Sequence, residues 1–298
     1  MSKDTVLLHF EDEAAEALRL AQAVGLELAE IERHRFPDDE LRLRLPAELP
    51  PNVVLYRSLH RPNEKLLELL LVARTAGRLG AQHLTLVAPY LAYMRQDKAF
   101  RSGEVVSQRI VGEFLAGLFD GVITVDPHLH RIDSLAEAIP VPHALALSGA
   151  ELLAKVAVER RERPLLVGPD AESRQWVEAA ARPHGLDYLV CDKIRHDDCN
   201  VDIALPAGAA VAGRAVVLLD DVASSGHTLA RAATVLRAAG AVSVDVAVTH
   251  ALFAGDALDL IHAAGVGEVW STDCIAHPSN AISVAPMLAE ALREIGVS

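Results

Sequence analysis

Residues 214–236, RAVVLLDDVASSGHTLARAATVL, combine acids, hydroxyls and a glycine in a pattern that could bind a ligand. The apolar run 215–219 predicts a buried strand, and Asp220 and Asp221 follow it directly. In open parallel sheets, ligands bind at the carboxyl ends of the strands, which is where these carboxylates are expected. Small and hydroxyl residues then open a helix: Ser224, Ser225, Gly226 and Thr228.

The start of that helix and the acids before it favour different ligand groups. Free backbone N–H groups, hydroxyls and the positive end of the helix dipole favour a phosphate. Two carboxylates would repel the phosphate unless they bind sugar hydroxyls or, through water, a cation. A phosphorylated sugar satisfies both requirements. The alternative is structural: Ser224 or Ser225 caps the helix, and the two acids are solvated.

A second candidate site is the cation-rich segment 94–101, MRQDKAFR, which follows a predicted strand. Arg95, Lys98 and Arg101 suit a polyphosphate, and Gln96 or Asp97 could hydrogen-bond a base or ribose, so the segment suits a nucleoside triphosphate. The alternative is a solvated surface loop. Cations recur at Lys193 and Arg195 in "CDKIRHDDCN", although the chain as a whole is acidic.

Composition excludes several classes of function. The formal net charge of -13 argues against non-specific nucleic-acid binding, which needs many Lys and Arg side chains on phosphates. Three scattered cysteines give neither a disulfide framework nor a zinc pattern, so we expect a reducing cytoplasmic location. We expect no signal peptide and no contact with a membrane, because no apolar run approaches the length of a span.

Short apolar runs alternate with alanine-rich helical patterns, which predicts an α/β fold with mainly parallel sheets flanked by helices. Predicted strands are 6–10, 41–45, 52–56, 84–88, 121–125, 165–168, 187–190, 215–219, 244–251 and 268–271. Predicted helices are 13–24, 64–79, 106–118, 149–160, 173–181, 228–239, 256–264 and 285–295. Prolines interrupt the rhythm in 137–147, "EAIPVPHALAL", so we predict two architecturally similar domains, 1–142 and 143–298.

The segment "VVLLDDVASSGHT" resembles the phosphoribosyl diphosphate binding motif of type I phosphoribosyltransferases and ribose-phosphate diphosphokinases. His227 stands where that motif usually has glycine. The first half distinguishes the two families, because ordinary phosphoribosyltransferases have no equivalent of an ATP-binding half. "PYLAYMRQDKAFRSGEVVSQRIVGEFL" resembles the RQDK-type ATP loop of the diphosphokinases, and "FPDDELRLRL" resembles their FxDGE-type segment, with Asp39 in place of glycine.

The diphosphokinase resemblance extends over residues 36–290 and implies two phosphoribosyltransferase-like domains. "TVDPHLHRI" resembles the family's VDLH segment, "LLVGPDAESRQWVEAAA" its PDxGS-like loop with Glu172 at a small-residue position, and "CIAHPSNAISVAPMLAEAL" its C-terminal segment. "CDKIRHDDCN" resembles the mobile KxR catalytic segment.

The resemblance also implies roles for individual residues. The implied ATP-binding residues are Phe36, Asp38, Glu40, Arg95, Gln96, Asp97, Lys98 and His128. The implied ribose 5-phosphate residues are Asp170, Asp220, Asp221, Ser224, Ser225, Gly226 and Thr228, and the implied catalytic residues are Lys193 and Arg195. His128 and Asp170 are the implied metal contacts, and Mg²⁺ fits better than zinc because His128 and His130 lack a third nearby ligand.

The implied activity is transfer of diphosphate from ATP to the anomeric hydroxyl of ribose 5-phosphate, which gives phosphoribosyl diphosphate and AMP. Phe36 would stack near the adenine of a neighbouring subunit, so a homo-oligomer is expected. Two alternatives remain open: a phosphoribosyltransferase that consumes phosphoribosyl diphosphate, and a non-catalytic nucleotide-binding paralogue. Asp39, Glu172 and His227 are the departures that keep the paralogue in consideration.

Overall fold

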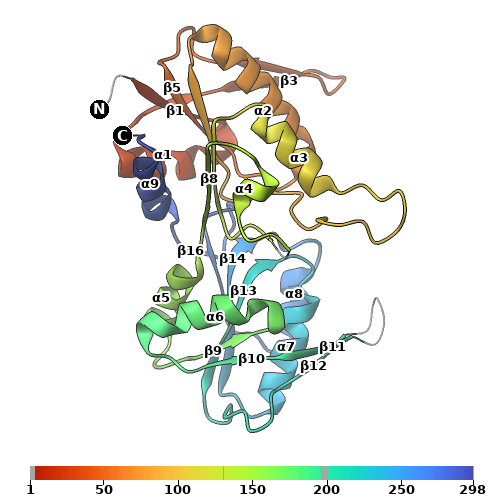
Figure 1. Ribbon diagram of the computed structural model, residues 1–298. Coiled ribbons are helices and arrows are strands. Elements are labelled where there is room, and N and C mark those ends of the chain that lie inside the picture. Colours follow the sequence, from red (N-terminus) through yellow and green to blue (C-terminus); the bar gives the residue numbers. More distant parts are fainter. Residues whose placement is uncertain (1–3, 130, 196–200, 298) are drawn as a thin grey trace. The chain divides into compact units, whose positions relative to one another are not determined.

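The computed structural model describes residues 4–129, 131–195 and 201–297, without the side chains of 193–195, 201 and 202 (Figure 1). The chain forms two compact units. Unit 1 comprises residues 1–147 and 285–298, and unit 2 comprises 148–284. The predicted α/β class is confirmed, because each unit contains a parallel sheet with flanking helices.

Unit 1 has a six-stranded parallel sheet and one separate hairpin. The sheet order is β2 (Glu27–Glu30), β1 (Thr5–His9), β5 (Asn52–Tyr56), β6 (His83–Val87), β7 (Gly121–Val125) and β8 (His143–Leu147). β3 (Glu32–Arg35) and β4 (Leu41–Arg44) form the antiparallel hairpin. The helices are η1 (Glu11–Glu13), α1 (Ala14–Val24), α2 (Pro62–Ala76), η2 (Gly77–Leu79), α3 (Ser107–Ala116), α4 (Leu135–Ala138) and α9 (Ala285–Glu294).

Unit 2 has the same strand arrangement. The sheet order is β10 (Tyr188–Val190), β9 (Leu165–Gly168), β13 (Ala215–Ala223), β14 (Ser243–Ala251), β15 (Val269–Thr272) and β16 (Asn280–Ile282). β11 (Asp192–Arg195) and β12 (Val201–Ala204) form its antiparallel hairpin. The helices are α5 (Ala150–Arg160), η3 (Ala171–Ser173), α6 (Arg174–Ala181), η4 (Arg182–His184), α7 (His227–Ala238) and α8 (Ala257–Ala263). In both units the second strand of the main sheet in chain order, β2 or β10, lies at the sheet edge. The third strand of that sheet, β5 or β13, pairs with the first.

Strand alternation explains how each sheet is covered on both faces. In β13, Val216 and Leu218 join the core cluster under α7 and α8, while Val217 and Leu219 join the cluster with α5 and α6. Successive side chains point to opposite faces, so a strand covered on both sides reads as a continuous apolar run. This is why the β13 strand was readable from sequence.

The division into units differs from the predicted domains, 1–142 and 143–298, in two places. β8 belongs to unit 1 because it pairs in parallel with β7, although Pro140 and Pro142 suggested a linker. α9 belongs to unit 1 because it packs against α1, β7 and β8. α5, the next helix after β8, packs instead within unit 2 against α6 and the sheet. Among the described helices, none is long and apolar enough to cross a membrane.

Candidate functional site

The acid pair of unit 2 lies within strand β13 rather than beyond its end. The predicted strand stopped at Leu219, but β13 continues to Ala223 because its ladder with β14 extends to the Ala223–Ala251 pair. Asp220 and Asp221 are both half-buried and lie near the carboxyl end of the sheet. The predicted placement at this edge is therefore correct, although the acids are part of the strand.

The surroundings of Asp220 disfavour the ionised form of its carboxyl group. Burial, followed by the carboxylates of Asp221 and Asp170, raises the pKa of Asp220 well above its usual value. The Asp221 backbone N–H donates to Asp220 Oδ1 at 3.1 Å and partly opposes that rise. A ligand that donates hydrogen bonds or carries positive charge would relieve this repulsion.

The loop from β13 to α7 is only three residues long, 224–226. Gly226 is the N-cap of α7, with φ of 75° and no side-chain cap. A Cβ there would lie 2.9 Å from the Ala257 carbonyl oxygen, so this tight turn requires glycine. The capping explanation for Ser224 and Ser225 is therefore wrong. Thr228 is half-buried in the first turn of α7, and Ser225 is exposed.

Asp170 lies in the loop from β9 to η3 and contributes to both local structure and local charge. Its carboxylate accepts a hydrogen bond from the Glu172 N–H at 3.1 Å, while Ser173 Oγ donates to the Asp170 carbonyl at 2.6 Å. Gly168 is needed because a Cβ there would lie 2.1 Å from Ser173 Oγ. Asp170 is also close enough to raise the pKa of Asp220, so the structure brings these predicted residues together.

Lys193 and Arg195 lie on β11, where they are register partners of Ile203 and Val201. Their side chains lie outside the described part of the structure, as do residues 196–200. The hairpin that carries them is the unit 2 counterpart of β3–β4, because each hairpin follows the second strand of its unit.

Phe36, Asp38 and Glu40 form the turn of the β3–β4 hairpin in unit 1. The Phe36 N–H donates to the Glu40 carbonyl at 2.8 Å, and the Asp39 N–H donates to the Phe36 carbonyl at 3.0 Å. Asp39 has φ of 69°, a left-handed conformation that aspartate tolerates better than most residues. The replacement of the usual glycine by Asp39 is thus compatible with a tight turn.

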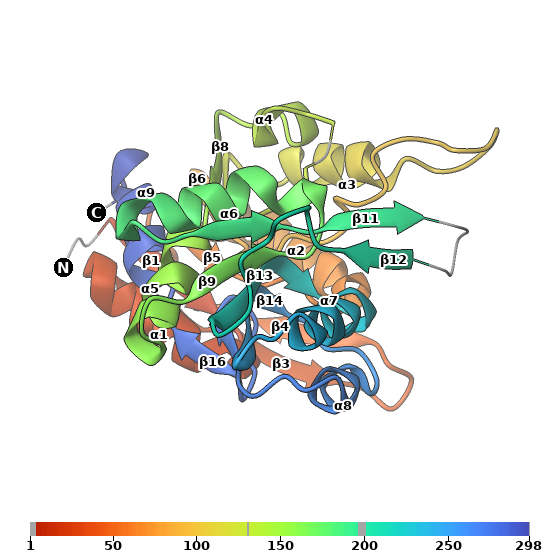
Figure 2. The same ribbon diagram turned by 90° about the horizontal axis from the view of Figure 1, so that it is seen from below.

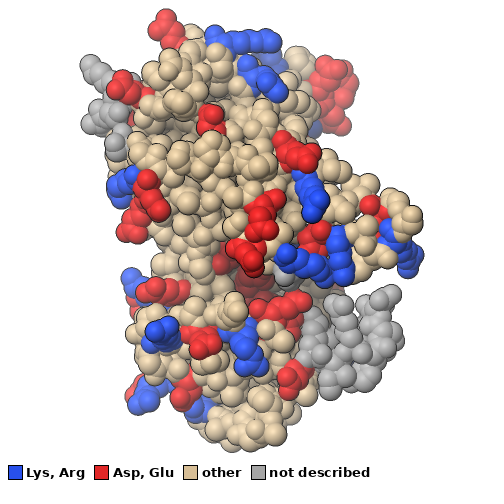
Figure 3. Space-filling view, in the orientation of Figure 1, with Lys and Arg blue, Asp and Glu red and all other residues tan. Residues whose placement is uncertain are grey.

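Two contacts that the sequence did not reveal hold the RQDK segment, one just before it and one within it. Gln108 on α3 is buried, and its Nε2 donates to the Met94 carbonyl at 3.0 Å. Arg131 forms an ion pair with Asp97 at 2.5 Å, and the Asp97 side chain is only 2 % exposed. Asp97 is therefore engaged by the segment that also carries His128, while Arg95 and Lys98 remain exposed. Charged side chains gather over this loop in Figure 3.

The structure does not bring the hairpin turn and the RQDK loop together within one chain. Both views show them as separate extensions of unit 1 (Figures 1 and 2). The hairpin contacts α2 and η1, whereas the RQDK loop contacts α3 and Arg131. The predicted ATP residues therefore form two groups in unit 1.

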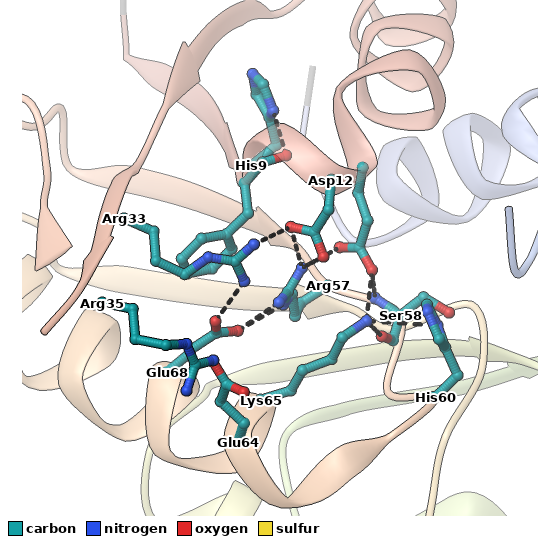
Figure 4. Close-up of polar contacts among 12 residues, drawn as sticks. His9, Asp12, Arg33, Arg35, Arg57, Ser58, His60, Glu64, Lys65 and Glu68 are labelled. Carbon is teal, nitrogen blue, oxygen red and sulfur yellow. Dashed lines mark hydrogen bonds and ion pairs between the residues drawn. The ribbon is translucent and has the colours of Figure 1, made fainter. Parts of the chain in front are cut away.

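Unit 1 also contains an ion network, with a buried centre, that sequence reasoning missed (Figure 4). We call it the Glu68 network: Asp12, Glu13, Arg33, Arg57, Lys65 and Glu68. Arg57 follows the end of β5, and its guanidinium contacts Glu68 Oε2 at 2.5 Å and Asp12 Oδ2 at 2.9 Å. Charged residues on α2 at helical spacing ordinarily indicate a solvated face, so this network has no clear signal in the sequence.

Burial and charge act against each other in this network. Burial alone would lower the pKa of Arg57, but the surrounding carboxylates outweigh it and raise that pKa. Burial raises the pKa of Glu13 despite Arg57 and Lys65, and lowers the pKa of Lys65. Burial, followed by the charges of Lys65 and Arg57, lowers the pKa of His60 to about 4.

The predicted metal contacts belong to separate units, His128 to unit 1 and Asp170 to unit 2. In the described part of the chain, no three His, Cys, Asp or Glu side chains are grouped as a metal site. Asp170, Asp220 and Asp221 of unit 2 carry hard oxygen donors, although the three do not form such a group. Such donors fit Mg²⁺, which keeps waters and uses few protein ligands.

Comparisons with known proteins agree over both units. Residues 5–118 match the family model for the N-terminal domain of ribose phosphate pyrophosphokinase, and residues 204–297 match the phosphoribosyl synthetase-associated domain. A crystal structure of phosphoribosylpyrophosphate synthetase from Mycobacterium smegmatis has the same fold, with a TM-score of 0.83 over 98% of this chain and 99% of that one, at 24% identity.

Two curated relatives cover almost the whole chain. The ribose-phosphate pyrophosphokinase of Methanopyrus kandleri is 37% identical over 93% of this chain and 94% of its own length. Ribose-phosphate pyrophosphokinase 1 of Archaeoglobus fulgidus is 36% identical over 93% of this chain and 95% of its own length. On these matches, and with a shared fold over both units, the chain belongs to the ribose-phosphate pyrophosphokinase family.

Proposed function

We propose that this chain transfers diphosphate from ATP to the C1 hydroxyl of ribose 5-phosphate. The C1 oxygen forms a bond to the β-phosphorus and gives up its proton to solvent, the bond between that phosphorus and the α,β-bridging oxygen breaks, and AMP leaves. The products are phosphoribosyl diphosphate and AMP. The observation that carries the proposal is the unit 2 edge, where an acid pair stands beside a tight, hydroxyl-bearing loop at the start of α7.

Ribose 5-phosphate fits that edge through two kinds of contact. Ser224, Ser225 and Thr228 offer hydroxyls, and the first turn of α7 offers backbone N–H groups, to the 5-phosphate. Asp220 and Asp221 accept hydrogen bonds from the ribose hydroxyls. Because the raised pKa of Asp220 opposes ionisation, hydroxyl donors and a nearby cation would stabilise its charged form.

ATP is assigned to unit 1. Arg95 and Lys98 are exposed cations for the polyphosphate, and Gln96 and His128 lie on the same two segments that Arg131 links. Phe36, Asp38 and Glu40 are assigned to the adenine of a neighbouring copy, because the hairpin turn extends separately from the RQDK loop. A homo-oligomer is therefore part of the proposal.

Lys193 and Arg195 are assigned to the transferred group. Their cations offset the charge that develops on the β-phosphoryl oxygens. Mg²⁺ would supply charge neutralisation at the phosphates, and its candidate protein contacts are His128 in unit 1 and Asp170 in unit 2. We place the reaction in the cytoplasm and assign neither nucleic acid nor membrane as a partner, in keeping with the net charge of -13.

The test is to incubate purified protein with ATP, Mg²⁺ and ribose 5-phosphate and to follow AMP by chromatography. We expect AMP and phosphoribosyl diphosphate in equal amounts. Lys193→Ala should lower kcat at least about a hundredfold, because one lost electrostatic donor typically costs about 3–4 kcal/mol. Lys155→Ala, an exposed lysine on α5, is the matched control and should leave kcat unchanged.

The same assay separates the alternatives. ATP binding without AMP release would favour the non-catalytic paralogue. Release of diphosphate from phosphoribosyl diphosphate that depends on an added base would favour a phosphoribosyltransferase. Either result would contradict the proposal.

A further inference from the structure

The β3–β4 hairpin has two distinct faces, which its register defines. Arg33 pairs with Leu43 and Arg35 with Leu41, whereas His34 pairs with Arg42. Because side chains alternate along a strand, Arg33 and Arg35 share the inner face. His34 and Phe36 point the opposite way, onto the outer face.

The inner face contacts α2 through two arginine–glutamate pairs (Figure 4). Arg33 Nη1 lies 2.7 Å from Glu68 Oε1, and Arg35 forms an ion pair with Glu64. Two residues along a strand span ~6.8 Å, and four residues along a helix rise ~6 Å, so the two spacings match. We call these two pairs the arginine clamp.

The deeper half of the clamp is fixed in the core. Glu68 is fully buried, and it is shared between Arg33 and the buried Arg57. Both guanidiniums also lie over the ring of Phe10, Arg57 at 4.4 Å and Arg33 at 5.4 Å from its centroid. A displaced Arg33 would give up a buried carboxylate contact and a cation–π contact together.

Phe36 lies on the outer face, where its ring is accessible to another molecule. Its side chain is 38 % exposed, and its ring packs edge-on against His34 at 4.9 Å. The guanidinium of Arg42 lies 6.0 Å from the same ring. The ring is therefore supported by the hairpin itself, and the hairpin is supported by the clamp.

We infer that the arginine clamp sets the orientation of the hairpin and so positions Phe36 against the nucleotide of a neighbouring copy, with Arg33 as the main positioning residue. This inference rests on the proposed function, in which the hairpin turn contacts adenine. Its consequence is that ATP affinity depends on an ion pair that contacts no substrate.

The test compares Arg33→Met with Arg44→Met in the full-length protein. Arg44 lies on the same hairpin, but its partner Glu32 is exposed and belongs to the hairpin itself, so its loss leaves the clamp intact. Arg33→Met should still fold, because Glu68 keeps Arg57. The readouts are KM for each substrate, ATP affinity by calorimetry, and amide hydrogen exchange of residues 32–44.

We expect Arg33→Met to raise KM and Kd for ATP about tenfold, to leave KM for ribose 5-phosphate within about twofold, and to speed exchange in the hairpin. Arg33→Lys should recover part of the ATP affinity, because it keeps the charge but lacks the two-pronged contact with Glu68 and Asp12. Arg44→Met should resemble the unaltered protein in all three readouts.

Two outcomes would overturn the inference. In the first, hydrogen exchange of the hairpin is unchanged in Arg33→Met; in the second, exchange is faster but Arg33→Met binds ATP as tightly as Arg44→Met does. A general fold defect would raise both KM values together and would also count against it. Failure of the unaltered protein to form AMP would refute the proposed function, whereas exchange and ATP calorimetry would still decide whether the clamp acts.

Discussion

Units 1 and 2 have the same strand order but opposite chemistry at the carboxyl ends of their first and third strands. In unit 1 the helix η1 after β1 carries Asp12 and Glu13, and Arg57 after β5 forms ion pairs with both. In unit 2 the loop after β9 carries Asp170, and β13 carries Asp220 and Asp221 where unit 1 has Arg57. The largest influences on the pKa of Asp220 are burial and two further carboxylates.

The difference separates an edge whose buried acids form ion pairs within unit 1 from the equivalent edge of unit 2, to which we assign ligand binding. Unit 1 neutralises its buried acids internally, and the Glu68 network then supports a hairpin that carries candidate substrate residues. Unit 2 retains a charge imbalance that a ligand and a cation can correct. A buried charge cluster that remains uncompensated costs stability and is typical of a functional site.

Removal of the unit 1 cation should give the largest effect. Arg57→Met leaves Glu68 and Glu13 short of a buried partner, so the free energy of unfolding should fall by about 3–5 kcal/mol. Urea unfolding followed by circular dichroism measures this. Arg44→Met, which breaks an exposed pair, should cost less than about 0.5 kcal/mol. Equal losses of unfolding free energy in Arg57→Met and Arg44→Met would show that the ion pairs of Arg57 do not stabilise the unit 1 edge more than a surface pair does.

Removal of a unit 2 acid should have the opposite pattern. Asp220→Asn should lower kcat/KM for ribose 5-phosphate by about ten- to a hundredfold, the range for one lost hydrogen bond to a charged group. The free energy of unfolding should be unchanged or higher, because the variant removes a carboxyl whose ionisation burial opposes. A clear loss of stability in Asp220→Asn, measured by urea unfolding, would show that the acid is structural.

The pH dependence of stability should also differ in sign. His60 of unit 1 takes up a proton near pH 6.5 in the unfolded chain, but in the folded protein it stays neutral down to pH about 4. Acidification through this window therefore destabilises the fold. His60→Gln should reduce that loss by about 1–2 kcal/mol, with allowance for solvent around the half-buried ring.

In unit 2 the raised pKa of Asp220 has the opposite effect on stability. Its contribution to the free energy of unfolding increases as pH falls towards ~4, and Asp220→Asn should abolish that contribution. Urea midpoints between pH 4 and 8 measure both slopes.

The smallest effect concerns the RQDK loop of unit 1. Arg131→Met removes the partner of Asp97 and should raise KM for ATP about threefold, the scale of ~0.7 kcal/mol for a half-exposed ion pair. Initial rates at varied ATP, with ribose 5-phosphate saturating, give this value. A fall in kcat at unchanged KM would mean that Arg131 acts on the reaction itself rather than on the loop.

Some of the site was readable from sequence because its signals are local. The apolar run of β13, the acids that follow it and the small residues before α7 are contiguous, and each has a conformational or chemical reason at its own position. The Asp39 departure is also local, since a single residue adopts the left-handed conformation of the turn. His227 begins α7, and Gly226 supplies the positive φ at its N-cap.

Other features depend on partners distant in the chain. Arg57 and Glu68 look like solvated charges until β1, β5 and α2 come together and bury them, and Arg33 on β3 then forms an ion pair with the buried Glu68. Arg131 acquires a role through Asp97, 34 residues earlier. The segment of β8 was predicted to belong to a domain boundary because Pro140 and Pro142 interrupt the pattern before it, and its pairing with β7 determined that it is a strand of unit 1.

By itself, the sequence determined the α/β class, the family and the residues at the acidic edge of unit 2, because periodicity and contiguous motifs express short-range physics. Only the tertiary structure decided that α9 belongs to unit 1. It also decided that Arg57 forms ion pairs with the acids at one sheet edge of unit 1, whereas the equivalent edge of unit 2 carries carboxylates where unit 1 has that arginine. The physical reason is that burial sets the strength of a charge interaction, and burial depends on which distant segments pack together.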